Sequence, residues 1–381
     1  MNSKTSVVFI LPFFRCGGVE AWASHACKAL NKYFTDVSII TLEEPVLEKN
    51  FFVDFPANIY SCESIFHAYC ILIRKSFNSR VILVSALTRC NLYCLPLNIL
   101  PNIYHISSVH LTLLRISAGN NFAYLARLFA HVLIVIFSSR TLAVSAGVKQ
   151  DLLKIFFWQK NIVRKVSLIY NPCFSAEQLN WILQQKKTLL VPRNFPERFG
   201  CDFISAGRLH PQKGFARLIQ AFDLLPDSIK SNSTLTIYGE GIEKDQLISM
   251  ISDLNLASRV KILPFSSNIA SKISKYDVFV LPSVYEGFGN VLAEALSTGI
   301  YCISFDCPHG PSEILANGDY GVLVSPLNVV LLSQAMKKSA SYLERESYRN
   351  SLSSKSDSFY SHIFQFSVES FRDSIRKYLL I

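Results

Sequence analysis

The stretch that decides the fold is DVFVLPSVYEGFGNVLAEALSTG, residues 277–299. Its first seven residues (277–283) are mostly β-branched or apolar and predict a buried strand, and a Gly-Phe-Gly turn follows. Apolar residues at helical spacing then predict a helix from Asn290 to Thr298, with Gly299 as the residue that ends it. Strand, tight turn and helix in this order form the repeating unit of a parallel sheet.

The same unit recurs through most of the chain. Further strands are predicted at residues 6–13, 36–42, 80–86, 102–110, 201–209, 234–241, 260–265 and 301–306, and a strand, a turn and a helix at 141–156. Helices are predicted at residues 17–34, 214–225, 244–256 and 366–380. Alternating strands and helices favour an α/β protein with parallel sheets.

A polar segment with two prolines, residues 175–200, interrupts this rhythm and reads as a linker. We therefore expect two Rossmann-like domains that face each other across a cleft. The N-terminal domain spans 1–175 and the C-terminal domain 176–360. Residues 361–381 form a C-terminal helix that can cross back to the N-terminal domain.

The composition argues against a membrane span and against a disulfide scaffold. The most apolar run, residues 122–137, is interrupted by Arg127 and His131 and is shorter than the roughly 18 residues that read as a span. We interpret it as a buried helix, with an interfacial helix as the alternative. The ten cysteines are scattered without a CxxC pair, which is typical of reduced thiols rather than of a zinc site. The N-terminus lacks a cleavage site, so no signal peptide is expected.

The net charge of +10 is unevenly distributed. Residues 1–180 hold 17 Lys and Arg against 9 Asp and Glu, so most of the excess lies in the N-terminal half. A basic half indicates an anionic partner such as lipid headgroups, a diphosphate or nucleic acid. The cations are dispersed and no nucleic-acid module is evident, so nucleic acid is not expected. A basic but merely solvated surface is the alternative.

Ligands of open parallel sheets bind beyond the carboxyl ends of the strands, so the strand-to-helix turns are the candidate sites. Gly17 and Gly18 follow the first strand, where glycine lets a ligand approach the backbone and a helix N-terminus favours phosphate. Arg208 and Lys213 flank a second turn, and two cations there suit a diphosphate. The alternatives are an ordinary tight turn and two solvated cations.

Other strand ends carry weaker candidates. Glu240, between Gly239 and Gly241, either meets a ligand or caps the next helix. Ser312 and Glu313 are interpreted as helix caps. His110 ends the strand at 102–110, where a structural histidine is the alternative to a cleft residue.

Glu286 and Glu294 flank the Gly-Phe-Gly turn, eight positions apart. Glu286 precedes the helix N-terminus, where anions are favoured, so helix capping is one interpretation. Glu294 lies at the edge of the apolar arc of its helix, about 60° from Val291 at 100° per residue. It therefore points along the cleft rather than straight into water.

Together these stretches resemble the retaining GT-B glycosyltransferases of family 4. The pieces that carry the resemblance are GGVE (17–20), LAVSAGV (142–148), IYNP (169–172), AGRLHPQKGF (206–215), YGEG (238–241), residues 277–299, GPSEIL (310–315) and GDYGVLV (318–324). Residues 201–326 match densely, and the N-terminal half matches sparsely. The two glutamates match the family's pair of acids separated by seven residues.

The resemblance implies a role for each matching residue. Arg208 and Lys213 hold the donor diphosphate, Glu286 binds and orients the donor sugar, and Glu294 accepts hydrogen bonds from the ribose. His110 contacts the transferred sugar. The backbone of Gly287, Phe288, Gly289 and Asn290 faces the sugar and phosphate, and Gly17 and Gly18 close over the diphosphate. Arg208, Lys213, Glu286 and His110 are thus the expected catalytic residues.

The resemblance also implies the reaction. A hexose of mannose or galactose type moves from a UDP- or GDP-linked donor, with retention, by front-face attack assisted by a phosphate oxygen. No DxD triad is present, and Arg208 with Lys213 replaces a metal, so we expect neither metal nor cofactor.

The acceptor is expected to be a saccharide on polyprenyl diphosphate, in the biosynthesis of O-antigen or another surface polysaccharide. The protein would then work in the cytoplasm, peripherally at the inner face of the cytoplasmic membrane. The alternatives are a soluble glucan or small-molecule transferase of the same fold, a sugar-nucleotide 2-epimerase, and a nucleotide-binding partner without catalysis.

Overall fold

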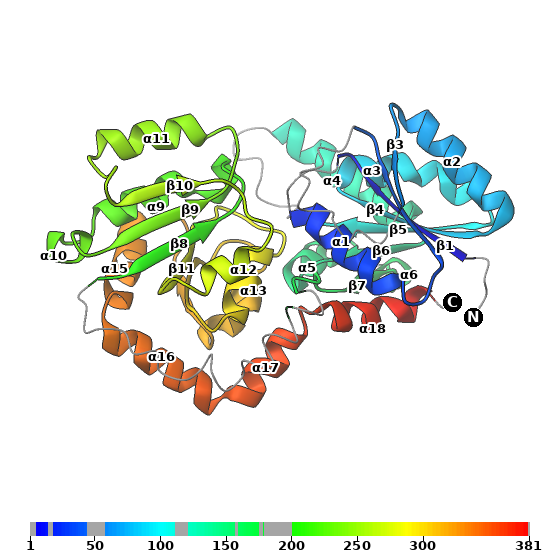
Figure 1. The fold of residues 1–381 in the computed structure, drawn as a ribbon. Coiled ribbons are helices and arrows are strands. Elements are labelled where there is room, and N and C mark those ends of the chain that lie inside the picture. Colours follow the sequence, from blue (N-terminus) through cyan, green and yellow to red (C-terminus); the bar gives the residue numbers. More distant parts are fainter. Residues whose placement is uncertain are drawn as a thin grey trace. The chain divides into compact units, whose positions relative to one another are not determined.

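The computed structural model describes residues 5–13, 18–43, 58–110, 121–156, 159–174, 178 and 200–379. The chain divides into two compact units (Figure 1). Unit 1 comprises Met1–Cys173 and Phe366–Ile381, and unit 2 comprises Phe174–Gln365. The chain therefore returns to unit 1 for its last helix. The predicted linker at 175–200 lies almost entirely outside the described residues.

Unit 1 is built on a parallel sheet in the order β3-β2-β1-β4-β5-β6-β7. Its strands are β1 (Thr5–Leu11), β2 (Asp36–Thr41), β3 (Asn58–Ser61), β4 (Arg80–Ala86), β5 (Ile103–Val109), β6 (Arg140–Ala143) and β7 (Val166–Leu168). All neighbouring strands pair in parallel. The sequence predicts each of these strands except β3 and β7, whose four and three residues are too few to show a pattern.

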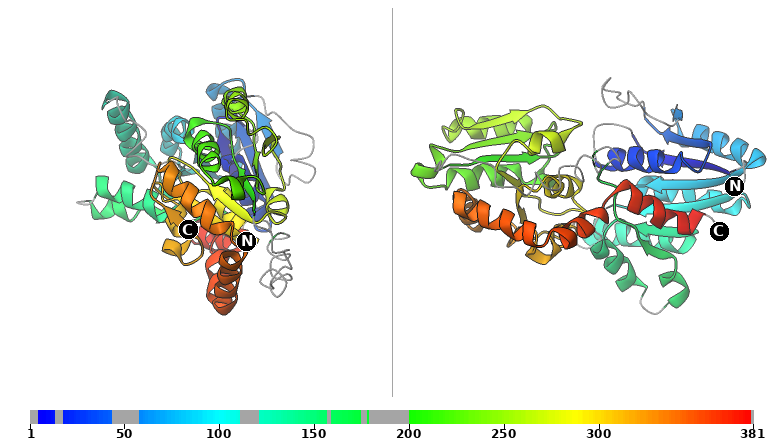
Figure 2. Two further views of the ribbon diagram at one scale, coloured as in Figure 1. Left: turned by 90° about the vertical axis from the view of Figure 1, so that its left-hand side faces the viewer. Right: turned by 60° about the horizontal axis from the view of Figure 1, so that its bottom comes forward.

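Helices cover both faces of this sheet. They are α1 (Gly18–Leu30), α2 (Ile65–Asn78), α3 (Thr88–Cys94), the 3-10 helix η1 (Leu95–Ile99), α4 (Asn121–Phe137), α5 (Ala146–Ile155), α6 (Lys160–Val163) and α18 (Val368–Leu379). One core joins α1 and α18 to the sheet, and the cores of the other face involve α2, α3, α4 and α5. The C-terminal α18 lies beside α1 (Figures 1 and 2).

Strand β4 shows why a central strand of this sheet appears in the sequence as an unbroken apolar run. Val81 and Leu83 pack into the core with α2 and α3, whereas Ile82 and Val84 pack into the core with α1 and α18. A central parallel strand is covered on both faces, so both sets of alternating side chains are apolar. The run RVILVSA therefore becomes β4 with the predicted bounds.

Unit 2 is built on a second parallel sheet in the order β10-β9-β8-β11-β12-β13. Its strands are β8 (Asp202–Ala206), β9 (Thr234–Tyr238), β10 (Val260–Leu263), β11 (Val278–Leu281), β12 (Tyr301–Phe305) and β13 (Val322–Val324). Every pair of neighbours is parallel. The predicted α/β class is confirmed, because each unit has the strand–helix alternation of a Rossmann-like domain.

The helices of unit 2 follow the same alternation. They are η2 (Pro211–Lys213), α9 (Phe215–Asp223), α10 (Asp227–Lys230), α11 (Lys244–Asp253), α12 (Ile269–Ile273), α13 (Asn290–Ser297), α14 (Pro311–Ile314), η3 (Ala316–Gly318), α15 (Val329–Ser339), α16 (Tyr342–Ser354) and α17 (Ser356–Phe364). The opening stretch forms β11, the turn and α13, and Gly299 adopts the left-handed φ of 70° expected after a helix end.

Helix α4 is the predicted apolar helix at 122–137, and it is only half buried. Ile134 and Val135 are inaccessible to solvent, whereas Phe129 is 63% exposed and Phe137 57% exposed. The interpretation as a buried helix is therefore wrong for one side of it. Among the described residues, no helix is long and apolar enough to cross a membrane.

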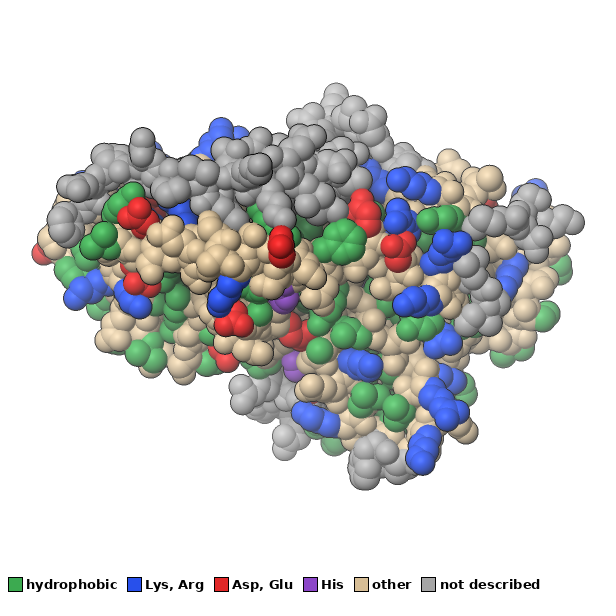
Figure 3. Space-filling view, turned by 90° about the horizontal axis from the view of Figure 1, so that it is seen from below, with side chains coloured by type: hydrophobic (Ala, Val, Ile, Leu, Met, Phe, Trp, Pro, Cys, Tyr) green, Lys and Arg blue, Asp and Glu red, His purple; other side chains and the backbone are tan. Residues whose placement is uncertain are grey.

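Charge is unevenly spread over the surface. Lys and Arg side chains gather over unit 1, on the right-hand side of Figure 3, where acidic side chains are sparse. This agrees with the excess of cations in residues 1–180.

Candidate functional site

The candidate site of unit 2 lies at the carboxyl ends of two neighbouring strands. β8 and β11 pair in parallel, with Phe203 opposite Val278, so their carboxyl ends lie at the same edge of the sheet. Arg208 and Lys213 follow β8, and Glu286 follows β11. The topology thus brings together two turns that are more than 70 residues apart in the chain.

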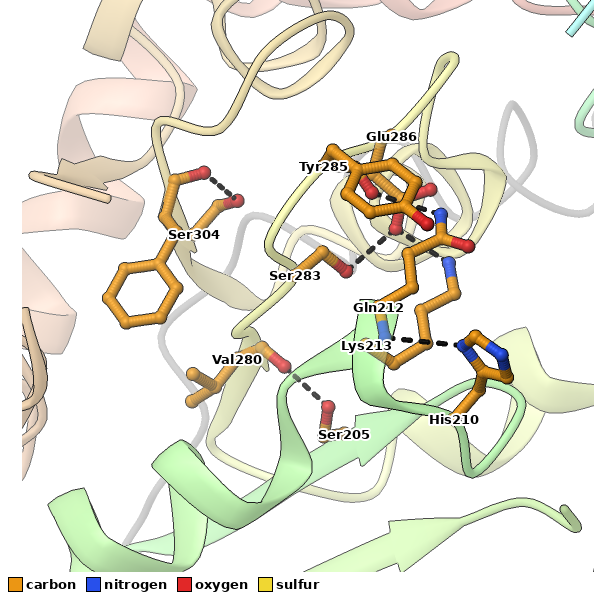
Figure 4. Close-up of polar contacts among 10 residues, drawn as sticks. Ser205, His210, Gln212, Lys213, Val280, Ser283, Tyr285, Glu286 and Ser304 are labelled. Carbon is orange, nitrogen blue, oxygen red and sulfur yellow. Dashed lines mark hydrogen bonds and ion pairs between the residues drawn. The ribbon is translucent and has the colours of Figure 1, made fainter. Parts of the chain in front are cut away.

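A buried carboxylate joins these turns (Figure 4). Oε1 of Glu286 accepts a hydrogen bond from Lys213 Nζ at 2.6 Å and another from Ser283 Oγ at 2.7 Å. The side chains of Lys213 and Glu286 are 18% and 7% exposed, so their ion pair is largely shielded from water. Within the described part of the chain, Oε2 of Glu286 has no hydrogen-bond partner. This oxygen therefore remains available to accept a hydrogen bond from a hydroxyl group of a ligand.

Gln212 holds the backbone of the two turns together. Its Nε2 donates to the carbonyl of Tyr285 at 3.0 Å, and its own carbonyl accepts the Val284 N–H at 2.8 Å. The N–H of Gln212 donates to Nδ1 of His210 at 3.3 Å (Figure 4). The side chain and the main chain of Gln212 therefore both connect the segment before Lys213 to the segment before Glu286.

Two glycines allow the turns to approach each other. Gly214 has a left-handed φ of 68°, and a Cβ there would collide with the carbonyl of Pro282. Gly310 has a φ of 99°, and a Cβ there would collide with the carbonyl of Phe288. Both positions require glycine for conformation and for space. Gly310 thereby packs the loop after β12 against the Gly-Phe-Gly turn.

Arg208 is exposed and stands outside this cluster. It forms no hydrogen bond or ion pair with the described residues, whereas the Lys213 side chain runs past the neighbouring Gly207. The structure therefore places Arg208 near the Lys213 stem but free to turn toward a ligand. Its five N–H donors are suited to the oxygens of a diphosphate.

Glu294 lies on α13, where its neighbours in sequence, Ala293 and Ala295, are buried. Its side chain is partly exposed, and burial raises its pKa to about 8. No hydrogen bond or ion pair reaches its carboxylate from the described residues, so nothing compensates for the lost hydration. An acid of this kind is a candidate ligand group rather than a structural one.

The capping interpretations are wrong at this edge of the sheet. Glu286 binds Ser283 and Lys213 instead of the N-terminus of α13, which is capped by Gly289 without a side-chain hydrogen bond. Ser312 and Glu313 lie inside α14, whose cap is Gly310 and which lacks a side-chain cap. The residues of the turn, Gly287, Phe288 and Gly289, are buried, and Asn290 begins the helix.

Glu240 does not cap α11 either. Its Oε2 pairs with Lys244 Nζ at 3.0 Å, and α11 starts after Glu243 without a side-chain cap. Gly239 and Gly241 allow a close approach, but to the backbone of the neighbouring turn. A Cβ at these positions would collide with the carbonyls of Gly207 and Leu209.

In unit 1, His110 directly follows β5 and is 8% exposed. Its Nε2 lies 2.9 Å from Ser108 Oγ, and its ring packs edge-on against Trp22 with centroids 4.7 Å apart. Burial lowers the pKa of His110 to about 3, so the imidazole is neutral near pH 7. Gly18 begins α1, and Gly17 lies outside the described residues.

Three side chains of these sites were missed by sequence reasoning: Ser283, Gln212 and Trp22. Ser283 had a signal, because it lies three residues before Glu286 at the end of a strand. Gln212 and Trp22 had none, since their contacts are made across the fold. Among the described residues, no cluster of three or more His, Cys, Asp and Glu side chains has the arrangement of a metal site.

Known proteins resemble unit 2 in sequence and the whole chain in fold. Residues 177–357 match the family described as glycosyl transferases group 1. The structure is similar to that of Anabaena HepE in complex with UDP-glucose, with a TM-score of 0.74 and 17% identity over 98% of this chain and 99% of that one. The chain has the GT-B glycosyltransferase fold. The expected fold class is therefore confirmed.

Curated relatives of this GT-B protein match it over part of their length. A Campylobacter jejuni N-acetylgalactosamine-N,N'-diacetylbacillosaminyl-diphospho-undecaprenol 4-alpha-N-acetylgalactosaminyltransferase is 34% identical over 160 residues, 41% of this chain and 42% of the relative. The lipopolysaccharide 1,6-galactosyltransferase of Salmonella typhimurium is 29% identical over 201 residues, 51% of each chain. The chain thus spans about half or less of these two relatives. The chain is thus similar, over part of its length, to proteins named as glycosyltransferases.

Proposed function

We propose that this protein is a retaining glycosyltransferase that moves a hexose, of mannose or galactose type, from a nucleotide sugar to a saccharide on polyprenyl diphosphate. The observation that carries the proposal is the buried Lys213–Glu286–Ser283 cluster at the edge of the unit 2 sheet. A cation and a carboxylate with one free oxygen, placed beside an exposed arginine, suit a phosphorylated sugar.

In this proposal the donor diphosphate lies over the turn after β8. Lys213 and Arg208 neutralise the charge that develops as the bond between the anomeric carbon and the phosphate oxygen breaks. Because Lys213 is already held by Glu286, little reorganisation is needed when this charge appears. The free Oε2 of Glu286 accepts a hydrogen bond from a hydroxyl of the donor sugar and thereby orients the sugar ring.

The acceptor hydroxyl attacks the anomeric carbon on the face that the phosphate leaves. Its proton passes to a phosphate oxygen of the leaving group, so a new glycosidic bond replaces the phosphate bond with retention. Retention through a covalent intermediate requires a carboxylate at the anomeric carbon. We assign no nucleophile, since Glu286 is engaged with Lys213 and Ser283.

Glu294 is proposed to accept hydrogen bonds from the ribose of the donor. Its carboxylate lacks a partner in the described structure and its pKa is raised, so two hydroxyl donors would restore the interactions that burial removed. The backbone of residues 287–290 would then lie against the sugar and phosphate. His110, neutral and buried in unit 1, is proposed to meet the transferred sugar.

The acceptor is proposed from charge and from the relatives. Unit 1 carries most of the excess positive charge, which suits a diphosphate-linked lipid and the membrane that holds it. The name of the C. jejuni relative includes a diphospho-undecaprenol acceptor. We therefore place the reaction in the biosynthesis of O-antigen or a similar surface polysaccharide, peripherally at the inner face of the cytoplasmic membrane.

We propose catalysis without a metal or cofactor, since Arg208 and Lys213 supply the positive charge. The test is activity after treatment with EDTA. Retained activity is expected, whereas loss of activity that Mg²⁺ or Mn²⁺ restores would contradict this part of the proposal.

The deciding experiment is a screen of UDP- and GDP-hexoses against a polyprenyl-diphosphate-linked saccharide, read by mass spectrometry. We expect the acceptor to gain one hexose from one donor class. Transfer only to soluble glucans would favour the alternative acceptor. An epimerised donor in the absence of acceptor would favour an isomerase, and neither product with any donor would contradict catalysis.

A further inference from the structure

Helix α4 of unit 1 carries a continuous apolar stripe on its outer side. Leu125, Phe129 and Ile136 are 58%, 63% and 36% exposed. At 100° per residue these three positions fall within about 40° of one another, so they form one line along the helix. Val132 and Leu133, each partly exposed, lie beside this line.

The opposite side of α4 already has its partner. Ile134 and Val135 are fully buried, and Val135 packs with Val109 of β5 and Ala143 of β6. His131 is buried and its Nδ1 lies 2.8 Å from the carbonyl of Arg127. Helix α4 therefore has two apolar sides, one packed into the core of unit 1 and one exposed to solvent.

Further exposed apolar side chains lie at the C-terminal end of α4 and on η1. Asn98 Nδ2 donates to the carbonyl of Phe137 at 2.7 Å, which brings η1 to the end of α4. Ile99, at the end of η1, is 85% exposed, and Phe137 is 57% exposed. We call Ile99, Leu125, Phe129, Ile136 and Phe137 the apolar ridge. An exposed run of large apolar side chains indicates an interaction surface.

The segment that contains α4 and the strands after it is almost free of acidic residues. Residues 121–170 contain seven Lys and Arg but a single acidic residue, Asp151, which is buried on α5. Lys165 Nζ donates to the carbonyl of Ile136 at 2.8 Å, directly at the C-terminal end of α4. Arg164 and Lys160 near it are exposed. The ridge therefore has a cationic border at the end of the helix.

We infer that the apolar ridge is the surface by which unit 1 docks onto a lipid bilayer that contains anionic lipids. The large apolar side chains would enter the boundary between headgroups and acyl chains, and the cations would meet the lipid phosphates. Helix α4 would lie in the plane of the interface. A protein partner or a second copy would be expected to carry acidic groups opposite Lys165 and Arg164, whereas anionic lipid headgroups supply negative charge along the whole cationic border.

The inference extends the proposed function, because an acceptor on polyprenyl diphosphate resides in a bilayer. Its test needs neither donor nor acceptor, so the two can fail separately. The full chain is sedimented with vesicles of phosphatidylcholine alone and of phosphatidylcholine mixed with phosphatidylglycerol. We expect binding to the mixed vesicles that weakens with added salt.

The test variant is the double substitution Leu125→Ser with Phe129→Ser, and Leu343→Ser is the matched control. Leu343 is 74% exposed on α16 of unit 2, so it removes a comparable apolar side chain away from the ridge. We expect the double variant to lose about tenfold in vesicle binding with an unchanged melting temperature, and the control to bind like the wild type. A third variant, Lys160→Glu with Arg164→Glu, should lose binding to the mixed vesicles.

Undiminished binding of the folded double variant would overturn the inference, as would an equal loss in Leu343→Ser. Light scattering of the free proteins provides a further check. A wild-type dimer that becomes monomeric in the double variant would show that a second copy covers the ridge instead of lipid.

Discussion

Nζ of Lys213 lies 2.6 Å from Oε1 of Glu286, although the two residues are 73 positions apart in the chain. Each belongs to a different strand-to-helix turn of the same parallel sheet. The ion pair is largely buried, so removing either partner would leave a charge without compensation. This ion pair therefore links the turn after β8 to the turn after β11.

Glu286→Gln should lower the rate of sugar transfer by about 100-fold or more, because the variant loses the charge that holds Lys213 in place. The initial rate of product formation at saturating donor measures this. Glu346→Gln on α16 is the control, and it should retain the wild-type rate. A Glu286→Gln enzyme of normal rate would remove Glu286 from the proposed mechanism.

Ser283→Ala should lower kcat about tenfold, since Glu286 loses one of the two hydrogen bonds that fix its Oε1. Ser205→Ala removes an equally buried hydrogen bond, from Ser205 Oγ to the carbonyl of Val280 at 2.6 Å. Both substitutions should cost about 1 kcal/mol of unfolding free energy in urea titrations. Only Ser283→Ala should change kcat, and equal kcat values in the two variants would assign Ser283 a purely structural role.

The raised pKa of Glu294 predicts a pH dependence of stability. The carboxyl is protonated in the folded protein up to about pH 8, whereas it ionises near 4.5 in the unfolded chain. The folded state therefore binds more protons between these values, and stability falls as pH rises through this window and levels off above it. Urea midpoints measured across the window should fall less in Glu294→Gln. A variant with the wild-type slope would contradict the prediction.

The same carboxyl should make binding of a nucleoside diphosphate stronger as pH rises through about 8, because the ionised form accepts hydroxyl hydrogen bonds. Calorimetric titration with UDP and with GDP at several pH values measures this. In Glu294→Gln the affinity should be lower at high pH and should not rise with pH.

His110 should remain neutral over the working pH range, since burial lowers its pKa to about 3. Its ring proton resonances should not titrate between about pH 5 and pH 8, unlike those of an exposed histidine. The unfolded chain takes up this proton near pH 6.5, so the contribution of His110 to stability falls as pH decreases below that value. A resonance that titrates near pH 6.5 would contradict the buried position.

Gly310→Ala should destabilise unit 2 and abolish transfer, because its Cβ would meet the carbonyl of Phe288. Gly318→Ala is the matched control: its φ of 104° is close to that of Gly310, but no atom lies within 4 Å of its Cβ. The control should show only the conformational penalty, about 1 kcal/mol. The difference between their melting temperatures measures the steric contribution, and equal melting temperatures would exclude it.

Most strands could be predicted because buried parallel strands have a strong signal. RVILVSA at 80–86 and VFVL at 278–281 are apolar on both faces, and glycines or polar residues mark their ends. β3, β7 and β13 were missed because each is an edge strand of three or four residues, too short to show such a run. Helix α4 was misjudged because composition reports how apolar a helix is, whereas burial depends on what packs against it.

The sequence by itself determined the α/β class, the strand–turn–helix stretch at 277–299 and the candidate residues Arg208, Lys213, Glu286 and Glu294. These features depend on local periodicity and on residue type, which can be recognised in the sequence without knowledge of the tertiary structure. Only the tertiary structure decided that Glu286 pairs with Lys213 and Ser283 instead of capping α13, and that one side of α4 is left uncovered. Both outcomes depend on contacts between distant segments, and the order of strands in a parallel sheet, not the order of residues, sets those contacts.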